Sequence, residues 1–171
     1  MKRSLIWGVL LLWLSGNAGA QDSKFDLSQR FLLLATKKTG TMQKELSEAA
    51  AAGYRLIGAS TTAGTEMVVI LEKVATPPNT YEYYLLATSR TGTMQREIGE
   101  IADKGFRLIP QTIIAKEQML GGIEIVLIME KPPELSTEYK YRLLATSRTS
   151  TMQKEMSQAM EEGFRVVGMA S

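Results

Sequence analysis

The sequence predicts an α+β fold made of tandem β-α-β-β units, in which each small, mainly antiparallel three-stranded sheet carries one helix on a face. The first observation is internal repetition, because closely similar stretches occur at 33–45, 85–97 and 143–155. Self-similarity at a spacing of roughly 50–60 residues indicates a repeated supersecondary unit. The second observation is that each copy joins an alternating apolar pattern to a helical one. The third is that proline-containing segments separate the copies, and proline interrupts strands and helices.

Residues 1–20 are left out of the fold because they have the features of a secretory signal peptide. The chain begins with basic residues, 5–14 is an apolar run too short to span a bilayer comfortably, and 18–20 is a small-residue cleavage site. We expect cleavage before Gln21 and an exported protein, periplasmic or secreted, without stable membrane insertion. The alternative is an uncleaved membrane anchor. A lipid-anchored lipoprotein is excluded because the chain has no cysteine.

The composition excludes several classes of function. The chain has 20 Lys and Arg against 18 Asp and Glu, and two of the basic residues lie in the signal, so the remainder is balanced and does not indicate nucleic-acid binding. The absence of Cys and His removes disulfides, thiolate metal sites and the commonest general base. A Ser or Thr nucleophile would lack its usual base, and no Ser-x-x-Lys pattern occurs. We therefore expect no cofactor, no metal and no enzymatic activity.

Three units follow the signal: unit 1 covers 21–76, unit 2 covers 77–133, and unit 3 covers 134–171. Each unit begins with a strand, expected at 81–88 in unit 2 and 139–146 in unit 3, where aromatic and apolar residues alternate with polar ones. A second strand directly follows a glycine in every unit, and a third strand follows a turn in units 1 and 2. The expected second strands are 54–57, 106–109 and 164–167, and the expected third strands are 67–71 and 123–129.

The third strands are nearly continuous in apolar residues, which indicates central strands that are covered on both faces. A right-handed crossover makes the first and second strands parallel, and the hairpin makes the third antiparallel to the second. The expected order in each sheet is therefore first, third, second. The helix covers one face of the sheet, and a neighbouring unit is expected to cover the other.

The helix of each unit has apolar residues at i, i+4, i+7 and i+8, which form a single stripe for the core. In unit 1 these residues are Met42, Leu46, Ala49 and Ala50, and we interpret the methionines of the stripes as core filler. The residue types at the helix ends predict N-caps at Thr41, Thr93 and Thr151, first-turn carboxylates at Glu45, Glu97 and Glu155, and C′ glycines at Gly53, Gly105 and Gly163.

Unit 3 stops at Ser171, before the apolar strand that we place at the centre of the other units. Two outer strands without a central strand cannot pair, and the apolar face of the helix is left bare. We therefore expect that the chain is a fragment, or that another chain supplies the strand through homo-oligomerisation or strand donation.

The residues 83–86, 97–98, 105–107 and 123–131 resemble the short bacterial domain of unknown function numbered 4177. The shared features are a strand that opens with aromatics, a helix that ends in Gly-aromatic, and a following hairpin. The resemblance covers the chain after the signal as tandem copies, and it implies a small βαββ module without catalytic residues. That family often has Asn after the helix leucine and Trp after the glycine, where this chain has Ser or Gly and Tyr or Phe.

The loop between the first strand and the helix is the candidate site. It combines hydroxyls, the backbone N–H groups of a helix N-terminus and a basic residue, and this combination binds anions. The candidate residues are Lys38, Thr39, Thr41, Arg90, Thr91, Thr93, Arg148, Thr149 and Thr151. A cation near a helix N-terminus opposes the helix dipole, which favours either a bound anion or a nearby glutamate. The alternative is a loop that only caps the helix, because Ser and Thr prefer such positions.

The leading hypothesis is a non-catalytic exported repeat protein that acts as a binding or interaction module of the cell envelope. Its expected partner is an envelope protein or a small anion. The alternative is a binder of small anions or phosphorylated glycans that uses the strand-to-helix loops. The arginines that follow the C′ glycines are interpreted as structural, because a cation is favoured near a helix C-terminus. These arginines are Arg55, Arg107 and Arg165.

Overall fold

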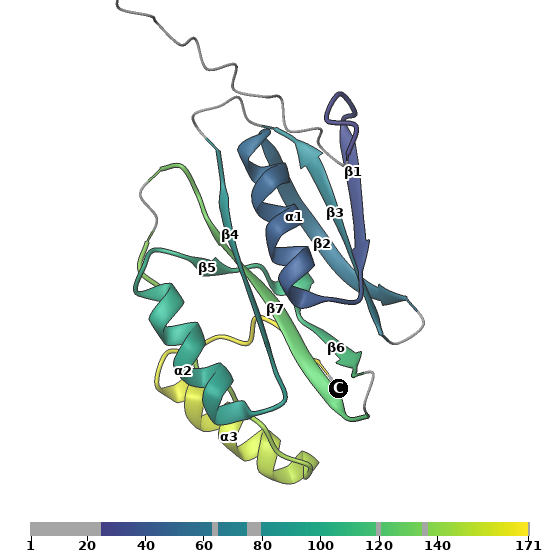
Figure 1. The fold of residues 1–171 in the computed structure, drawn as a ribbon. Helices are drawn as coiled ribbons and strands as arrows, with labels where there is room; N and C mark the ends of the chain where they lie inside the picture. The colour runs from purple at the N-terminus through teal and green to yellow at the C-terminus, as the bar shows by residue number, and fades with distance from the viewer. Residues whose placement is uncertain (1–24, 63–64, 75–79, 119–120, 135–136, 171) are drawn as a thin grey trace, which may run out of the picture.

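The computed structural model describes residues 25–62, 65–74, 80–118, 121–134 and 137–170. In these residues the chain has an α+β fold with three α-helices and two antiparallel sheets (Figure 1). The expected signal peptide, 1–20, lies outside the described residues. None of the helices in the described ranges combines the length and the apolar character that crossing a membrane requires.

Unit 1 forms the sheet that the sequence predicts, which we call sheet 1. Its strands are β1 (Phe31–Thr36), β2 (Tyr54–Thr62) and β3 (Glu66–Lys73). The order is β1-β3-β2, and both outer strands run antiparallel to β3, so they are parallel to each other. The helix α1 (Thr39–Ala51) packs its buried residues onto one face of this sheet. The predicted order of first, third and second strand is confirmed.

Unit 2 forms sheet 2 with the same strand order and one interruption. Its elements are β4 (Glu82–Thr88), α2 (Thr91–Ala102), β5 (Arg107–Leu108), the 3-10 helix η1 (Pro110–Thr112), β6 (Ile114–Glu117) and β7 (Ile123–Lys131). The central β7 pairs with β4 on one edge and with β5 and β6 on the other. The predicted strand at 106–109 is therefore shorter than expected, because Pro110 has no N–H to donate to the ladder. The buried Thr112 hydroxyl instead accepts the N–H of Ile128 at 2.9 Å.

The helices begin three residues earlier than predicted, so the expected N-caps at Thr41, Thr93 and Thr151 are wrong. The N-cap residues are Lys38, Arg90 and Arg148. The reason is a tight turn at the end of each preceding segment, in which a threonine hydroxyl accepts the N–H two residues later. The acceptors are Thr36, Thr88 and Thr146, at 3.1–3.2 Å.

The other two predictions for the helix ends have different outcomes. The first turn of each helix contains no acidic residue, because the earlier start moves the predicted glutamates into the helix interior. Glycines with positive φ do follow the helices, as predicted, at Gly53 (91°), Gly105 (86°) and Gly163 (91°). A left-handed backbone there satisfies the end of the helix without a Cβ clash.

Side chains of the first strand alternate between the two faces of each sheet. In β1, Leu32 and Leu34 are buried and pack with α1, whereas Phe31 and Leu33 are exposed on the opposite face. In sheet 2 the opposite face is covered, because Tyr83 belongs to the core of unit 1 and α1 contacts β4. Sheet 2 therefore lies between α1 and α2 (Figure 1).

The prediction that the third strands are covered on both faces holds for only one of them. In β7 every residue of 126–130 is buried. In β3 the side chain of Ile70 is 41% exposed. The difference arises because unit 1 covers the second face of sheet 2, while the described segments leave Phe31, Leu33 and Ile70 exposed on the second face of sheet 1.

Unit 3 does not form the predicted strands at 139–146 and 164–167, and both segments lack ladder hydrogen bonds. The helix α3 (Thr149–Glu161) does form, but its only buried residue is Ala159, and Met160 is 59% exposed. A strand needs a partner for its N–H and C=O groups. No described residue of unit 3 occupies the central position that β3 and β7 occupy in the other units, so the outer segments stay unpaired.

Candidate functional site

The three strand-to-helix loops lie at the starts of α1, α2 and α3, and their basic N-cap residues are exposed. Within the described ranges, no hydrogen bond or ion pair joins one loop to another. The N-cap side chains make no capping hydrogen bond. The loop of unit 1 has one additional contact, in which the buried Lys116 donates from Nζ to the Lys37 carbonyl at 3.5 Å. Lys116 also pairs with Glu124 at 3.3 Å.

A glutamine that the sequence did not single out joins the helix of one unit to the first strand of the next unit. The Gln43 side chain on α1 donates from Nε2 to the Tyr83 carbonyl at 2.9 Å. Its Oε1 accepts the N–H of Leu85 at 2.7 Å. A side-chain amide offers both a donor and an acceptor, so it can bind the free edge of a strand as a neighbouring strand would. Gln43 therefore anchors β4 to α1.

The same contact recurs between units 2 and 3. The Gln95 side chain on α2 donates to the Tyr141 carbonyl at 3.0 Å and accepts the N–H of Leu143 at 2.6 Å. The third copy of this glutamine is Gln153, on α3, which is exposed. No described residue hydrogen-bonds its side-chain amide. The signal in the sequence was the glutamine itself, which occupies the same position in all three copies although it lies off the apolar stripe.

A tyrosine hydroxyl makes a second recurrent contact between units. The hydroxyl of Tyr83 accepts the N–H of Leu56 at 2.8 Å. The hydroxyl of Tyr141 accepts the N–H of Leu108 at 2.8 Å in the same way. The equivalent residue of unit 1 is Phe31, which has no hydroxyl.

A buried carboxylate links units 1 and 2. Glu130 on β7 is 1% exposed and binds two arginines, Arg55 of unit 1 at 3.0 Å and Arg107 of unit 2 at 2.8 Å. These hydrogen bonds raise the pKa of both guanidinium groups. Burial raises the pKa of Tyr83 well above its usual range, so its hydroxyl stays neutral and donates to Glu130 at 3.3 Å. These two ion pairs and the hydrogen bond from Tyr83 explain why Glu130 can be buried, because a charge in the interior needs paired charges and hydrogen bonds.

Arg55 and Arg107 are therefore structural, as the sequence predicted, but Glu130 holds them rather than the helix dipole alone. The third arginine of the set, Arg165, is exposed. The described residues offer it no carboxylate within ion-pair distance.

The outer face of sheet 1, which we define by three cross-strand pairs, has nearly the same residues as the face of sheet 2 that is buried against unit 1. The cross-strand pairs of the outer face are Phe31 with Glu72, Leu33 with Ile70, and Ala35 with Val68. The buried pairs of sheet 2 are Tyr83 with Glu130, Leu85 with Ile128, and Ala87 with Val126. Only the aromatic residue differs between the two sets.

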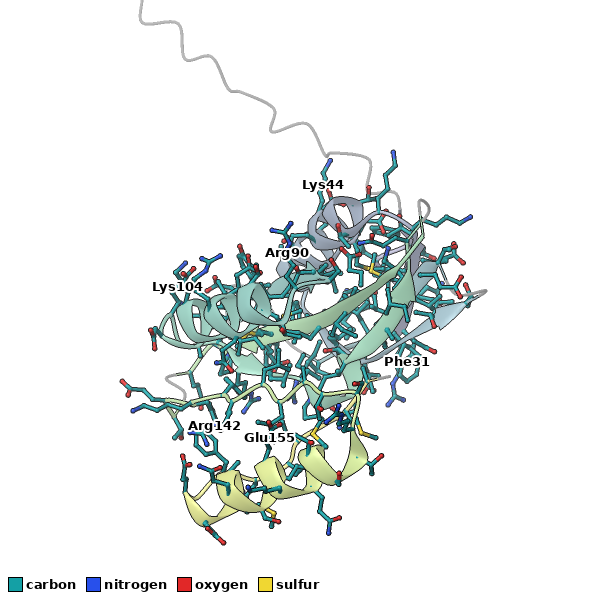
Figure 2. All side chains as sticks on the ribbon, turned by 90° about the horizontal axis from the view of Figure 1, so that it is seen from below. Phe31, Lys44, Arg90, Lys104, Arg142 and Glu155 are labelled. Carbon is teal, nitrogen blue, oxygen red and sulfur yellow. The ribbon has the colours of Figure 1, made fainter. Side chains whose placement is uncertain are left out.

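The two faces differ strongly in exposure. Tyr83 is 5% exposed and Ile128 is 1% exposed in sheet 2. On the outer face of sheet 1, Phe31 is 50% exposed, Leu33 is 64% exposed and Ile70 is 41% exposed. The outer face is therefore an apolar surface with the composition of an internal contact. Figure 2 shows Phe31 at a distance from α3.

The fold and these contacts define a layered α+β protein in which a helix and an arginine of one layer bind the sheet of the next. The described residues contain no group of three or more side chains that could hold a metal ion. No family model matches the chain, and the comparisons with curated proteins and with solved structures give no match either. The resemblance to domain of unknown function 4177 therefore rests on the residues given above.

Proposed function

We propose that the chain is a non-catalytic, exported interaction module of the cell envelope, built from repeated units, and that the outer face of sheet 1 binds a protein partner. The observation that carries the proposal is the apolar character of this exposed face. Contiguous exposed apolar patches mark sites of interaction in soluble proteins. The outer face also carries Glu72, the residue equivalent to the buried Glu130.

The contacts inside the chain indicate the chemistry of this partner. The corresponding face of sheet 2 takes a helix that carries a glutamine, followed by an arginine just beyond the helix end. A partner that presents the same two groups would bind the free edge of β1 and add a second arginine to Glu72, which pairs with Arg30. The outer face is therefore expected to select a helix with a glutamine and a nearby arginine.

Site-specific photocrosslinking in cells that export the protein tests this proposal. A benzoylphenylalanine in place of Leu33 should give protein adducts, because this side chain lies on the outer face. The same group in place of Lys44, an exposed residue of α1 with a side chain 73% exposed, should give none. Absence of adducts from position 33, or equal adducts from both positions, would refute the assignment of this face.

A second candidate function is the binding of small anions or phosphorylated glycans at the strand-to-helix loops. The observation in its favour is that a cation occupies each N-cap without making a capping hydrogen bond. The N–H groups of the first helical turn, which have no intrahelical acceptor, are then open to an anion.

We expect replacement of Arg90 and Arg148 by glutamine to abolish weak phosphate binding with little effect on stability. The helix dipole contributes roughly 0.3–1 kcal/mol at an exposed N-terminus, so the arginines are needed and binding should weaken with salt. Phosphate titration at low ionic strength, followed by the amide shifts of Gly92 and Thr93, measures the effect. Arg96→Gln is the matched control, because Arg96 is an exposed arginine of the same helix that pairs with Glu100. If phosphate does not change these amide shifts, or changes them equally in the double variant, the loop is only a turn that starts the helix and the anion-binding proposal is wrong.

A further inference from the structure

We propose that a second copy of this chain covers the outer face of sheet 1 with its α3, so that copies associate head to tail. The inference rests on the proposed function, because both assign a partner to the same face. The occupant follows from the contacts between units 1 and 2. The glutamine and the arginine on one side have equivalents on unit 3, and the strand edge and the carboxylate on the other side have equivalents in sheet 1.

Unit 3 carries both side chains with which one unit binds the sheet of the next, and we call this surface the donor surface. Unit 1 holds sheet 2 with Gln43 on its helix and Arg55 after the helix. The equivalent residues of unit 3 are Gln153 and Arg165. Both are exposed, and no described residue binds the side chain of either. Unit 3 therefore presents the two groups that the outer face is built to receive.

Unit 1 carries a free strand edge like the one that Gln43 binds in unit 2, and we call this edge with the outer face the acceptor surface. The strand β1 is an edge strand, since it pairs with β3 alone. Its pairing has the same register as that of β4, so the Phe31 carbonyl and the Leu33 N–H lie on the free edge, as the Tyr83 carbonyl and the Leu85 N–H do in sheet 2. An unpaired strand edge is a ready binding site for a second chain. The Gln153 amide of a second copy would bind this edge as Gln43 binds β4.

The charges match in part, because Glu72 occupies the position of Glu130 but binds Arg30 of its own unit. Glu130 uses both carboxylate oxygens, with Arg107 on Oε1 and Arg55 on both. In sheet 1, Nε and one terminal nitrogen of Arg30 donate to Oε1 of Glu72, at 3.0 Å and 2.8 Å. No described residue donates a hydrogen bond to Oε2 of Glu72, and Arg165 of another copy is the equivalent of Arg55.

Two contacts have no equivalent, and their loss lowers the strength of the association. Arg55 lies over the ring of Tyr81 at 5.0 Å, and unit 1 has Gln29 at the equivalent position. Phe31 stands where Tyr83 accepts the Leu56 N–H. The corresponding N–H of Val166 in the second copy would lack this acceptor. The contact between copies should therefore be weaker than the contact between units 1 and 2, and reversible.

The symmetry of this contact differs from that of an ordinary twofold dimer. Each copy has one outer face and one α3, and the two surfaces are different. Such a heterologous contact joins copies into a ring or an open filament. It also predicts that two variants, each defective in one surface, complement each other.

Two variants of the exported protein, each with one of the two surfaces disrupted, test the inference. Their mass is measured by sedimentation velocity, first alone and then in a mixture. The acceptor variant carries Leu33→Glu with Ile70→Lys, which are opposite charges on directly paired positions, and the donor variant carries Gln153→Ala with Arg165→Glu. All four side chains are exposed, so circular dichroism and the melting temperature should stay close to those of the unchanged protein. The unchanged protein should grow in mass with concentration, each variant alone should remain a monomer, and an equimolar mixture should form a one-to-one dimer. The single change Gln153→Ala should weaken association by about tenfold, because it removes two hydrogen bonds.

Several results would overturn the inference. An unchanged protein that stays monomeric at all concentrations removes the contact altogether. A variant that still associates with itself indicates another contact, such as donation of a strand to unit 3, and a mixture that stays monomeric excludes the head-to-tail arrangement. If the crosslink from position 33 contains a different protein and no second copy, the proposed function stands and this inference fails. If position 33 gives no crosslink, both fail.

Discussion

Replacing Ile128 by alanine should lower the free energy of unfolding by about 3 kcal/mol, whereas replacing Ile70 should lower it by less than about 1 kcal/mol. The two isoleucines occupy equivalent positions at the centres of β7 and β3, and each faces a leucine of the first strand. Ile128 is 1% exposed, so truncation leaves a cavity between sheet 2 and unit 1. Ile70 is 41% exposed, so its removal leaves no cavity in the single chain.

Urea unfolding of the two variants, at a concentration low enough to keep the protein monomeric, measures this difference. The pair controls for strand propensity and for side-chain chemistry, because the same substitution is made in the same pairing context. Equal losses of stability in the two variants would contradict the difference in burial between the faces of sheets 1 and 2.

Replacing Glu130 by alanine should lower the free energy of unfolding by about 2–4 kcal/mol, and replacing Glu72 by less than about 1 kcal/mol. Without Glu130, two guanidinium groups face each other and the hydroxyl of Tyr83 loses its acceptor. The side chains of Arg55 and Arg107 are 43% and 34% exposed, so they can be hydrated again, and this keeps the loss below that of a fully buried pair.

Glu72 is the matched control for this substitution. It lies at the position equivalent to Glu130 and pairs with Arg30, whose side chain is 75% exposed. An exposed ion pair contributes little to stability. The measurement is again unfolding by urea, and restoration of stability in Glu130→Ala by a second change of Arg55 to Met would identify unpaired charge as the cause. A loss at Glu130 no larger than the loss at Glu72 would show that the carboxylate does not hold units 1 and 2 together.

Patterns within units 1 and 2 predicted most of their local structure, whereas in unit 3 only the predicted helix forms. The alternating residues of β1 and β4 and the apolar stripes of α1 and α2 depend on which side chains face one another along a short stretch, and this information is local. The starts of the helices were misplaced because two arrangements of neighbouring threonines compete. Thr41 can cap a helix, but Thr36 closes a turn five residues earlier, and the helix then begins before Thr41.

The candidate site could be predicted only in part. The loops were found by composition, and the structure leaves them as separate exposed turns. Gln43 and Gln95 were visible in the repeated stretch, but their role depends on which strand edge lies beside each helix. Glu130 could not be distinguished from Glu72 by its neighbours, because each follows the same apolar strand in its own unit.

The amino-acid sequence alone was sufficient to predict the α+β class, the order of first, third and second strand in units 1 and 2, and the central position of β3 and β7. Alternation, helical spacing and the handedness of crossovers constrain each unit separately. The packing of the units on one another determined the rest. Outer-face and buried residues such as Ile70 and Ile128 have the same neighbours along the chain, and they differ only in whether another unit lies against them. Burial is a property of the assembled layers, so the exposed copy of a buried face could be recognised only once sheet 1 and sheet 2 were placed in space.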